Sequence, residues 1–206
     1  MKTIPALISA ILISLLAACG QSNLPQEGKQ FERLPTDLSA YQLPVVTEVF
    51  SLNCGHCANM EPAIPQLEAA TNQTFGKVHV IFNQSAQVSA MIYYSAQTQL
   101  GKTPNSEMMK AMFDAIQMGY DLAPKQQEQA INNAFTAHAL ASPDKLTESQ
   151  KKAVLDAMEK AAEISQKGQI NAVPTFIVNG KYMVLLAGHK DLDGIANTIN
   201  YLIQQP

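Results

Sequence analysis

The chain has 206 residues, of which 47% are hydrophobic and 15% are charged, and its formal net charge is -3. This length suits one domain with a substantial core and is too short for two domains of typical size. The composition excludes a disordered chain, and the slightly acidic balance argues against nucleic acid as a partner.

The first eighteen residues have the pattern of an export signal. Lys2 supplies a positive start, and the apolar stretch Ile4–Ala18 is too short, and too interrupted by Pro5, Ser9 and Ser14, for a bilayer span. A buried core helix is the alternative interpretation. The charged start and the small residues at the end favour a signal peptide over residues 1–18.

The end of this segment, "LAAC" at Leu16–Cys19, resembles the lipobox of bacterial lipoproteins. The resemblance implies that Cys19 is lipidated and becomes the first mature residue, so acyl chains would hold the protein at a membrane without spanning it. Gly20 follows Cys19 rather than Asp, which favours the outer over the inner membrane. Residues 19–30 are polar and are expected to form a tether, with the protein in the periplasm.

The first half of the mature chain predicts two strands and a helix. Residues Phe31–Pro35 read as an edge strand that ends at the proline. Residues Val45–Phe50 are almost continuously apolar and β-branched or aromatic, as in a central strand buried on both faces. From Cys54 to about Thr71 apolar residues recur at helical spacing, with a bend expected at Pro62 or Pro65.

A second strong strand follows at Lys77–Phe82, and the period then changes. Residues 85–166 read as several helices, with end signals at Gly101, at Pro124 and in the capping box Thr147–Gln150. Four methionines at helical spacing there are expected to fill the core rather than bind copper. They are Met108, Met109, Met112 and Met118.

The C-terminal segment predicts a hairpin and a last helix. Two strand runs in Thr175–Leu186 flank the turn dipeptide Asn179-Gly180, and a helix is expected over about Leu192–Ile203. The element order predicts an α/β chain with a thioredoxin-like fold and an inserted all-helical subdomain. The thioredoxin-like domain would cover residues 31–84 and 167–206, and the helical insertion residues 85–166.

Cys54 and Cys57 lie at the turn between the central strand and its helix, in "LNCGHCANM". This spacing occurs in redox pairs, metal sites and structural disulfides. The loop between the two cysteines is too small for a disulfide to stabilise the fold much. A metal would need further ligands among the other histidines, and the sequence has no second cysteine pair and no closely spaced histidine pair. The histidines considered are His79, His138 and His189.

A redox pair fits this position best. The thiolate is the reactive form of cysteine, and unpaired backbone N–H groups at a helix start favour it, so Cys54 is the expected nucleophile. Cys57 lies one turn further and should be more buried. His56 lies between them and can add positive charge or a hydrogen bond near the Cys54 sulfur.

The mature chain resembles the DsbA family of bacterial periplasmic thiol:disulfide oxidoreductases. The resemblance rests on "EGKQFERL", "EVFSLNCGHC", "KVHVIF", the helical block and "VPTFIVNGKY", in that order. It implies a monomeric oxidase that introduces disulfide bonds into exported proteins by dithiol-disulfide exchange at Cys54 and Cys57, without a cofactor or a metal. The implied partners are unfolded or folding exported proteins with free cysteines, and a DsbB-type membrane protein that reoxidises the enzyme.

The resemblance also implies further site residues. Val173-Pro174 matches the loop in which a cis-proline faces the cysteines, and the Val173 backbone would pair with an extended substrate. Glu48 matches a buried acid that exchanges protons with Cys57, and Lys77 matches its companion base. An ordinary structural ion pair is the alternative for Glu48 and Lys77.

One residue departs from the family pattern. Gly55 stands where the best-known family members have proline, so the dipeptide is Gly-His, as in eukaryotic protein disulfide isomerase. A disulfide isomerase or reductase of the same fold is therefore the alternative activity. A metal-binding lipoprotein module and an inert surface lipoprotein are the alternatives from other classes.

Overall fold

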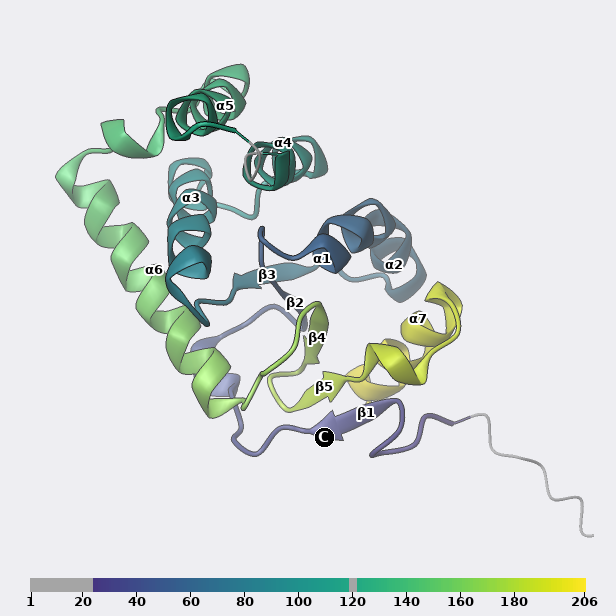
Figure 1. Cartoon of the computed structure of the whole chain (residues 1–206). Coiled ribbons are helices and arrows are strands. Elements are labelled where there is room, and N and C mark those ends of the chain that lie inside the picture. Colours follow the sequence, from purple (N-terminus) through teal and green to yellow (C-terminus); the bar gives the residue numbers. More distant parts are fainter. Residues whose placement is uncertain (1–23, 119–121) are drawn as a thin grey trace, which may run out of the picture.

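The computed structural model describes residues 24–118 and 122–206. The expected signal peptide and the lipidation candidate Cys19 lie outside these ranges. The expected α/β architecture is present, with a mixed sheet between helices (Figure 1). The strands are β1 Phe31–Arg33, β2 Val46–Phe50, β3 Gly76–His79, β4 Thr175–Val178 and β5 Tyr182–Val184. The helices are α1 Gly55–Met60, α2 Ile64–Thr71, α3 Gln84–Leu100, α4 Ser106–Gln117, α5 Pro124–Ala137, α6 Glu148–Lys167 and α7 Leu192–Ile203.

The sheet has the strand order β1-β5-β4-β2-β3. Strand β2 pairs in parallel with β3 and antiparallel with β4, and every residue of β2 is buried. The prediction of a central strand buried on both faces is therefore confirmed for Val46–Phe50. Because α1 follows β2 after a short loop, the centre of the sheet carries the two cysteines.

Each face of the sheet has its own apolar core. On one side Val49, Phe50 and Ile177 pack with side chains of α3, α4 and α6. On the other side Val46 and Phe176 pack with side chains of α2 and α7. Figure 1 shows these two groups of helices on opposite sides of the strands. Strand β2 thus contributes side chains to both cores.

The hairpin between β4 and β5 has the turn that its sequence predicts. Asn179 and Gly180 have φ values of 54° and 67°, in the left-handed region, and the Lys181 amide closes the turn on the Val178 carbonyl at 3.0 Å. The Asn179 side chain also donates hydrogen bonds to the carbonyls of Leu202 and Ile203 at 3.1 and 3.2 Å. The turn therefore caps the C-terminal end of α7.

Two element boundaries differ from the sequence prediction. The expected helix from Cys54 to Thr71 is divided by a 3-10 turn, Glu61–Ala63, which contains Pro62, so the bend lies at the first of the two candidate prolines. The strand expected to reach Phe82 ends at His79. Its partner β2 leaves the sheet after Phe50, so the residues beyond His79 have little strand left to pair with.

The helical block consists of α3 to α6, and its predicted end signals hold. Gly101 caps α3 in the left-handed conformation, Pro124 opens α5, and Thr147 with Gln150 forms the capping box of α6. Three of the four methionines fill the core as expected, but Met118 is 67% exposed. It caps the last turn of α4, where the buried face of that helix has ended. The domain limits at residues 84–85 and 166–167 stay a prediction.

The second half of the expected tether is folded. Residues 26–30 form a turn in which the Lys29 and Gln30 amides donate to the Gln26 carbonyl. The Leu185 amide donates to the Gln30 carbonyl at 2.8 Å, and a Cβ at Gly188 would lie 1.9 Å from the Lys29 carbonyl oxygen. This segment therefore packs on the chain after β5. Over residues 24–118 and 122–206, none of the helices combines the length and apolar character needed to cross a bilayer.

Candidate active site

The two cysteines lie where the central strand passes into α1. Cys54 is the N-cap of α1 in an extended conformation, and its sulfur accepts a hydrogen bond from the Cys57 amide at 3.3 Å. The Cys54 amide donates to the Ser51 carbonyl at 3.0 Å, which closes the turn before the helix. Both cysteines are free thiols. The backbone thus offers a donor to the Cys54 sulfur, as the position at a helix start predicts.

The two cysteines differ in exposure, and the buried one has a raised thiol pKa. Cys54 is partly exposed, whereas Cys57 has no accessible surface. Burial raises the pKa of the Cys57 thiol well above its ordinary value, and the neighbouring Cys54 and the Glu48 carboxylate raise it further. Solvent-borne thiols therefore meet Cys54 first.

The loop before β4 faces this pair, although it is far from it in sequence. The Val173-Pro174 peptide bond is cis. The Cys54 thiol donates a hydrogen bond to the Val173 carbonyl at 3.5 Å. Val173 and Pro174 are both partly exposed. The structure therefore brings the expected loop and the expected nucleophile together.

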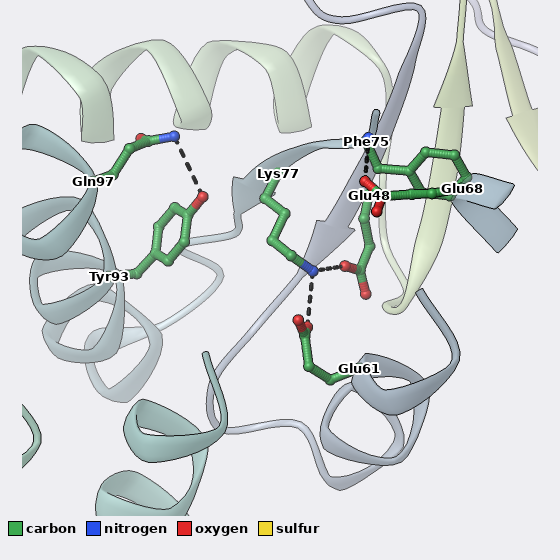
Figure 2. A network of polar contacts seen from close by, with 7 residues as sticks. All are labelled: Glu48, Glu61, Glu68, Phe75, Lys77, Tyr93 and Gln97. Carbon is green, nitrogen blue, oxygen red and sulfur yellow. Dashed lines mark hydrogen bonds and ion pairs between the residues drawn. The ribbon is translucent and has the colours of Figure 1, made fainter. Parts of the chain in front are cut away.

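Figure 2 shows a buried cluster of three charged side chains, in which Lys77 points toward Glu48 and Glu61. The Lys77 ammonium forms ion pairs with Glu48 and, at 2.8 Å, with Glu61. All three side chains are almost fully buried. The contact between Glu48 and Lys77 was expected, but Glu61 was missed. Its signal was its spacing: Glu61 follows Cys57 by four residues and so lies on the same helical face.

The charges in this cluster are unequally stabilised. Burial raises the pKa of Glu48 above its ordinary value, and Lys77 offsets this only in part. Burial acts to lower the pKa of Lys77, but the two carboxylates outweigh it, so the net pKa is raised and the ammonium stays protonated. The Oε1 atom of Glu48 has no hydrogen-bond partner within the described part of the chain. Glu48 is therefore the member best suited to take up and release a proton.

His56 lies on the surface between the cysteines. It is exposed and forms neither a hydrogen bond nor an ion pair with any residue in the described ranges. Its influence on the Cys54 thiolate stays a prediction.

The other three histidines lie at separate places in the fold, each with its own neighbours. Nε2 of His79 accepts a hydrogen bond from the Leu52 amide, Nε2 of His189 lies 3.0 Å from the Thr198 hydroxyl, and His138 caps the end of α5. Across residues 24–118 and 122–206, no three His, Cys, Asp or Glu side chains gather as a metal site would require.

Comparison with known proteins places this site in a family. The family model described as thioredoxin matches residues 42–200, which include both cysteines, the charged cluster and the Val173-Pro174 loop. The chain belongs to the thioredoxin family.

Within this family the similar proteins are DsbA proteins. The thiol:disulfide interchange protein DsbA of Burkholderia cepacia is 29% identical over 211 residues, covering 97% of this chain and 96% of the relative. The fold is similar to that of DsbA from Pseudomonas aeruginosa, with a TM-score of 0.67 and 22% identity over 87% of this chain and 97% of that one. The fold is also similar to that of DsbL from Salmonella enterica serovar Typhimurium, with a TM-score of 0.65 and 20% identity over 88% of this chain and 98% of that one.

These findings confirm the expected fold and the expected likeness. The chain is a DsbA-like thiol:disulfide oxidoreductase with a thioredoxin fold and helices inserted between β3 and β4.

This thioredoxin-family chain should lose stability in mild acid through His79. Burial lowers the pKa of His79 to about 4, from an ordinary value of 6.5. Between these values the unfolded chain binds a proton that the folded chain does not, so the free energy of unfolding should fall as pH drops from about 6.5 to about 4. The loss attributable to His79 is about 3 kcal/mol. Urea unfolding across this range measures it, and His79→Gln should flatten the slope; equal slopes for both proteins would contradict the assignment.

Proposed function

We propose that the protein is an exported oxidase that passes its Cys54–Cys57 disulfide to exported proteins with free cysteines. The observation that carries this proposal is the asymmetry of the pair. Cys54 is accessible and receives a backbone N–H, whereas Cys57 is buried with a raised thiol pKa. An accessible sulfur that is stable as a thiolate is attacked first and later leaves readily.

The exchange proceeds in two steps. A substrate thiolate attacks Sγ of Cys54 in the oxidised protein, the Cys54–Cys57 bond breaks, and a mixed disulfide forms while Cys57 takes up a proton. A second substrate thiolate then attacks the substrate sulfur of the mixed disulfide and releases Cys54 as a thiolate. The substrate loses two electrons and gains a disulfide, and the protein ends as a dithiol.

Glu48 is the proposed source of the proton that Cys57 takes up. Its carboxyl has a raised pKa through burial, its field acts on Cys57, and one of its oxygens has no hydrogen-bond partner among residues 24–118 and 122–206. Lys77 holds the other oxygen and fixes the orientation of the carboxyl. We assign Glu48 a role in proton transfer and Lys77 a role in positioning it.

The backbone at Val173 is the proposed binding site for substrate. Its carbonyl lies 3.5 Å from the Cys54 sulfur, so an extended peptide paired with Val173 would bring its own cysteine to Cys54. Pro174 follows Val173 through a cis peptide bond. His56, exposed beside Cys54, would contact the same peptide.

The cellular setting proposed here follows from the chain's N-terminus and its relatives. We place the protein in the periplasm as a monomer, lipidated at Cys19 and held at a membrane, with Gly20 favouring the outer one. A DsbB-type membrane protein would reoxidise the dithiol. Family likeness supports the client proteins and the reoxidant, and the lipobox pattern supports the anchor.

The equilibrium with glutathione tests the direction of exchange. An oxidase should have a Cys54–Cys57 reduction potential more oxidising than about -180 mV, the level of protein disulfide isomerase. The oxidised protein should also remove two hydrogens from a reduced peptide with two cysteines, as mass spectrometry records. A potential near that of thioredoxin, about -270 mV, would instead identify a reductase.

Gly55 supports one alternative, a disulfide isomerase. The Gly55-His56 dipeptide is the one that protein disulfide isomerase carries, and glycine there leaves the turn more freedom. Reactivation of a protein with scrambled disulfides by the reduced form, faster than oxidation of a dithiol peptide by the oxidised form, would favour it.

A further inference from the structure

The turn that carries the nucleophile is held by a buried histidine. The amide of Leu52, two residues before Cys54, donates to Nε2 of His79 at 2.9 Å. On the other side of the ring, Nδ1 of His79 donates to the Val80 carbonyl at 2.7 Å. A carbonyl only accepts and an amide N–H only donates, so this pair of contacts requires the neutral ring with its hydrogen on Nδ1.

Helix α3 contacts the same turn through Asn53. The Ser89 hydroxyl donates to Oδ1 of Asn53 and lies 3.2 Å from Nε2 of His79. Nδ2 of Asn53 donates to the Ser85 hydroxyl at 3.0 Å. We name His79, Asn53, Ser85 and Ser89 the loop brace. It joins the turn before the cysteines to strand β3 and to the first helix of the insertion.

Helix α4 completes the hold on the backbone of the turn. Nε2 of Gln117 donates to the carbonyls of Leu52 at 3.0 Å and of Cys54 at 3.1 Å. Leu52 therefore has its N–H bound by a side chain from the sheet and its C=O bound by a side chain from the insertion. Its own side chain has no accessible surface. Side chains from outside the turn thus hold both backbone polar groups of one of its residues, Leu52.

We propose that His79 is a positioning residue for the exchange reaction: together with Asn53 and Ser89 it holds the turn so that the Cys54 sulfur stays on the Cys57 amide and beside Val173. This inference rests on the proposed function of the same site. The brace does not touch the sulfur. It acts on the two residues that immediately precede Cys54, which decide where the N-cap of α1 lies.

Loss of the imidazole leaves a buried amide without an acceptor. An unsatisfied buried N–H is costly in free energy, so the Leu52 amide is expected to shift toward another acceptor. Such a shift displaces Cys54 from the Cys57 amide, and the thiolate of the reduced protein loses part of its stabilisation. Because the reduced form is favoured by that thiolate, the protein becomes a weaker oxidant.

The test compares His79→Leu, which removes the acceptor, with His79→Gln, whose side-chain oxygen can accept the same N–H. His79→Leu should lower the equilibrium constant for oxidation of glutathione about fivefold, the effect of one net hydrogen bond. It should also raise the thiolate pKa of Cys54, read from absorbance at 240 nm. His79→Gln should bring both the equilibrium constant and the thiolate absorbance most of the way back to the values of the unsubstituted protein. The Leu52 amide should exchange with solvent faster in His79→Leu than in His79→Gln.

Tyr94→Phe is the matched control. The Tyr94 hydroxyl accepts from the His79 amide at 3.0 Å, and its hydrogen bonds within the described residues go to the His79 backbone and not to the turn. Its loss therefore removes a buried hydrogen bond from the same residue. It should lower stability and leave the equilibrium constant within about twofold of the unsubstituted protein. Equal constants for His79→Leu and Tyr94→Phe would overturn the proposal.

A second variant covers the case in which His79→Leu does not fold. Asn53→Ala removes the link to α3 at a partly exposed position and should shift the constant in the same direction, about twofold. An unchanged constant and unchanged Leu52 amide exchange in Asn53→Ala would overturn the proposal. If the unsubstituted protein exchanges no disulfide with glutathione, the proposed function fails. Leu52 amide exchange in His79→Gln and Asn53→Ala then tests by itself whether the loop brace holds the turn.

Discussion

Cys54→Ser is expected to abolish dithiol oxidation, and Cys57→Ser is expected to trap substrate on the protein. A serine at residue 54 offers no sulfur for attack, so oxidation of a reduced peptide should fall to the rate measured without protein. With Cys57→Ser the accessible Cys54 still forms a mixed disulfide, for example with a peptide whose cysteine is already activated. The buried partner that would resolve the mixed disulfide from within the protein is then absent.

Mass spectrometry under non-reducing conditions distinguishes the two variants. Cys57→Ser should gain the mass of one peptide, and reductant should release it. The two variants are matched controls for each other, because each keeps one thiol of the same pair. If Cys54→Ser captured the peptide and Cys57→Ser did not, the roles assigned to the two cysteines would be reversed. Equal capture by both would mean that burial of Cys57 does not direct the attack.

Lys77→Met is expected to destabilise the fold by about 3–5 kcal/mol. The ammonium of Lys77 is the shared partner of Glu48 and Glu61, and all three are almost fully buried. Removing the cation leaves two carboxyl groups that repel one another in a site with little water. Both would protonate on folding, so the loss should be largest at neutral pH and should shrink as the pH falls toward the ordinary pKa of a carboxyl group. Urea unfolding at two pH values measures it.

Two further proteins make this prediction decisive. The triple variant Glu48→Gln, Glu61→Gln and Lys77→Met removes all three charges and should regain most of the stability, because replacing a whole buried network costs far less than breaking it. Lys152→Met removes a cation whose ion pair with Asp156 is well exposed and should change stability very little. The interpretation of the cluster would be wrong if Lys77→Met behaved like Lys152→Met.

Local patterns in the sequence predicted most of the fold. The apolar run of β2, the capping box at Thr147 and the Asn179-Gly180 turn each depend on near neighbours, and each occurs as expected. The predicted end of β3 was wrong because the observed end depends on where a distant partner strand leaves the sheet. The prediction that Met118 fills the core was wrong because helical spacing shows a periodic face but not where that face stops being buried.

The site was predictable to the extent that its residues carry a motif. Cys54, Cys57 and the Val173-Pro174 loop came from the spacing and the family resemblance, and the structure brings them together. Gln117 was missed because it reaches the turn only through the packing of α4 against it. Glu61 was missed although it follows Cys57 by four residues, at helical spacing. His79 lies in a predicted strand, which favours an ordinary core or surface histidine over a metal ligand. No pattern in its own strand indicated that its ring would accept an amide hydrogen from a turn far away in sequence.

The folded segment before β1 limits how far the site can stand from a membrane. Because residues 26–30 are fixed to the chain after β5, a lipid on Cys19 would be joined to the fold by residues 20–25 alone. A stretch of this length spans at most about 20 Å, roughly half the diameter of a domain of this size. An anchored molecule would therefore lie against the bilayer instead of ranging through the compartment. It would meet its clients only within a shallow layer at that surface, whose depth the chain itself sets.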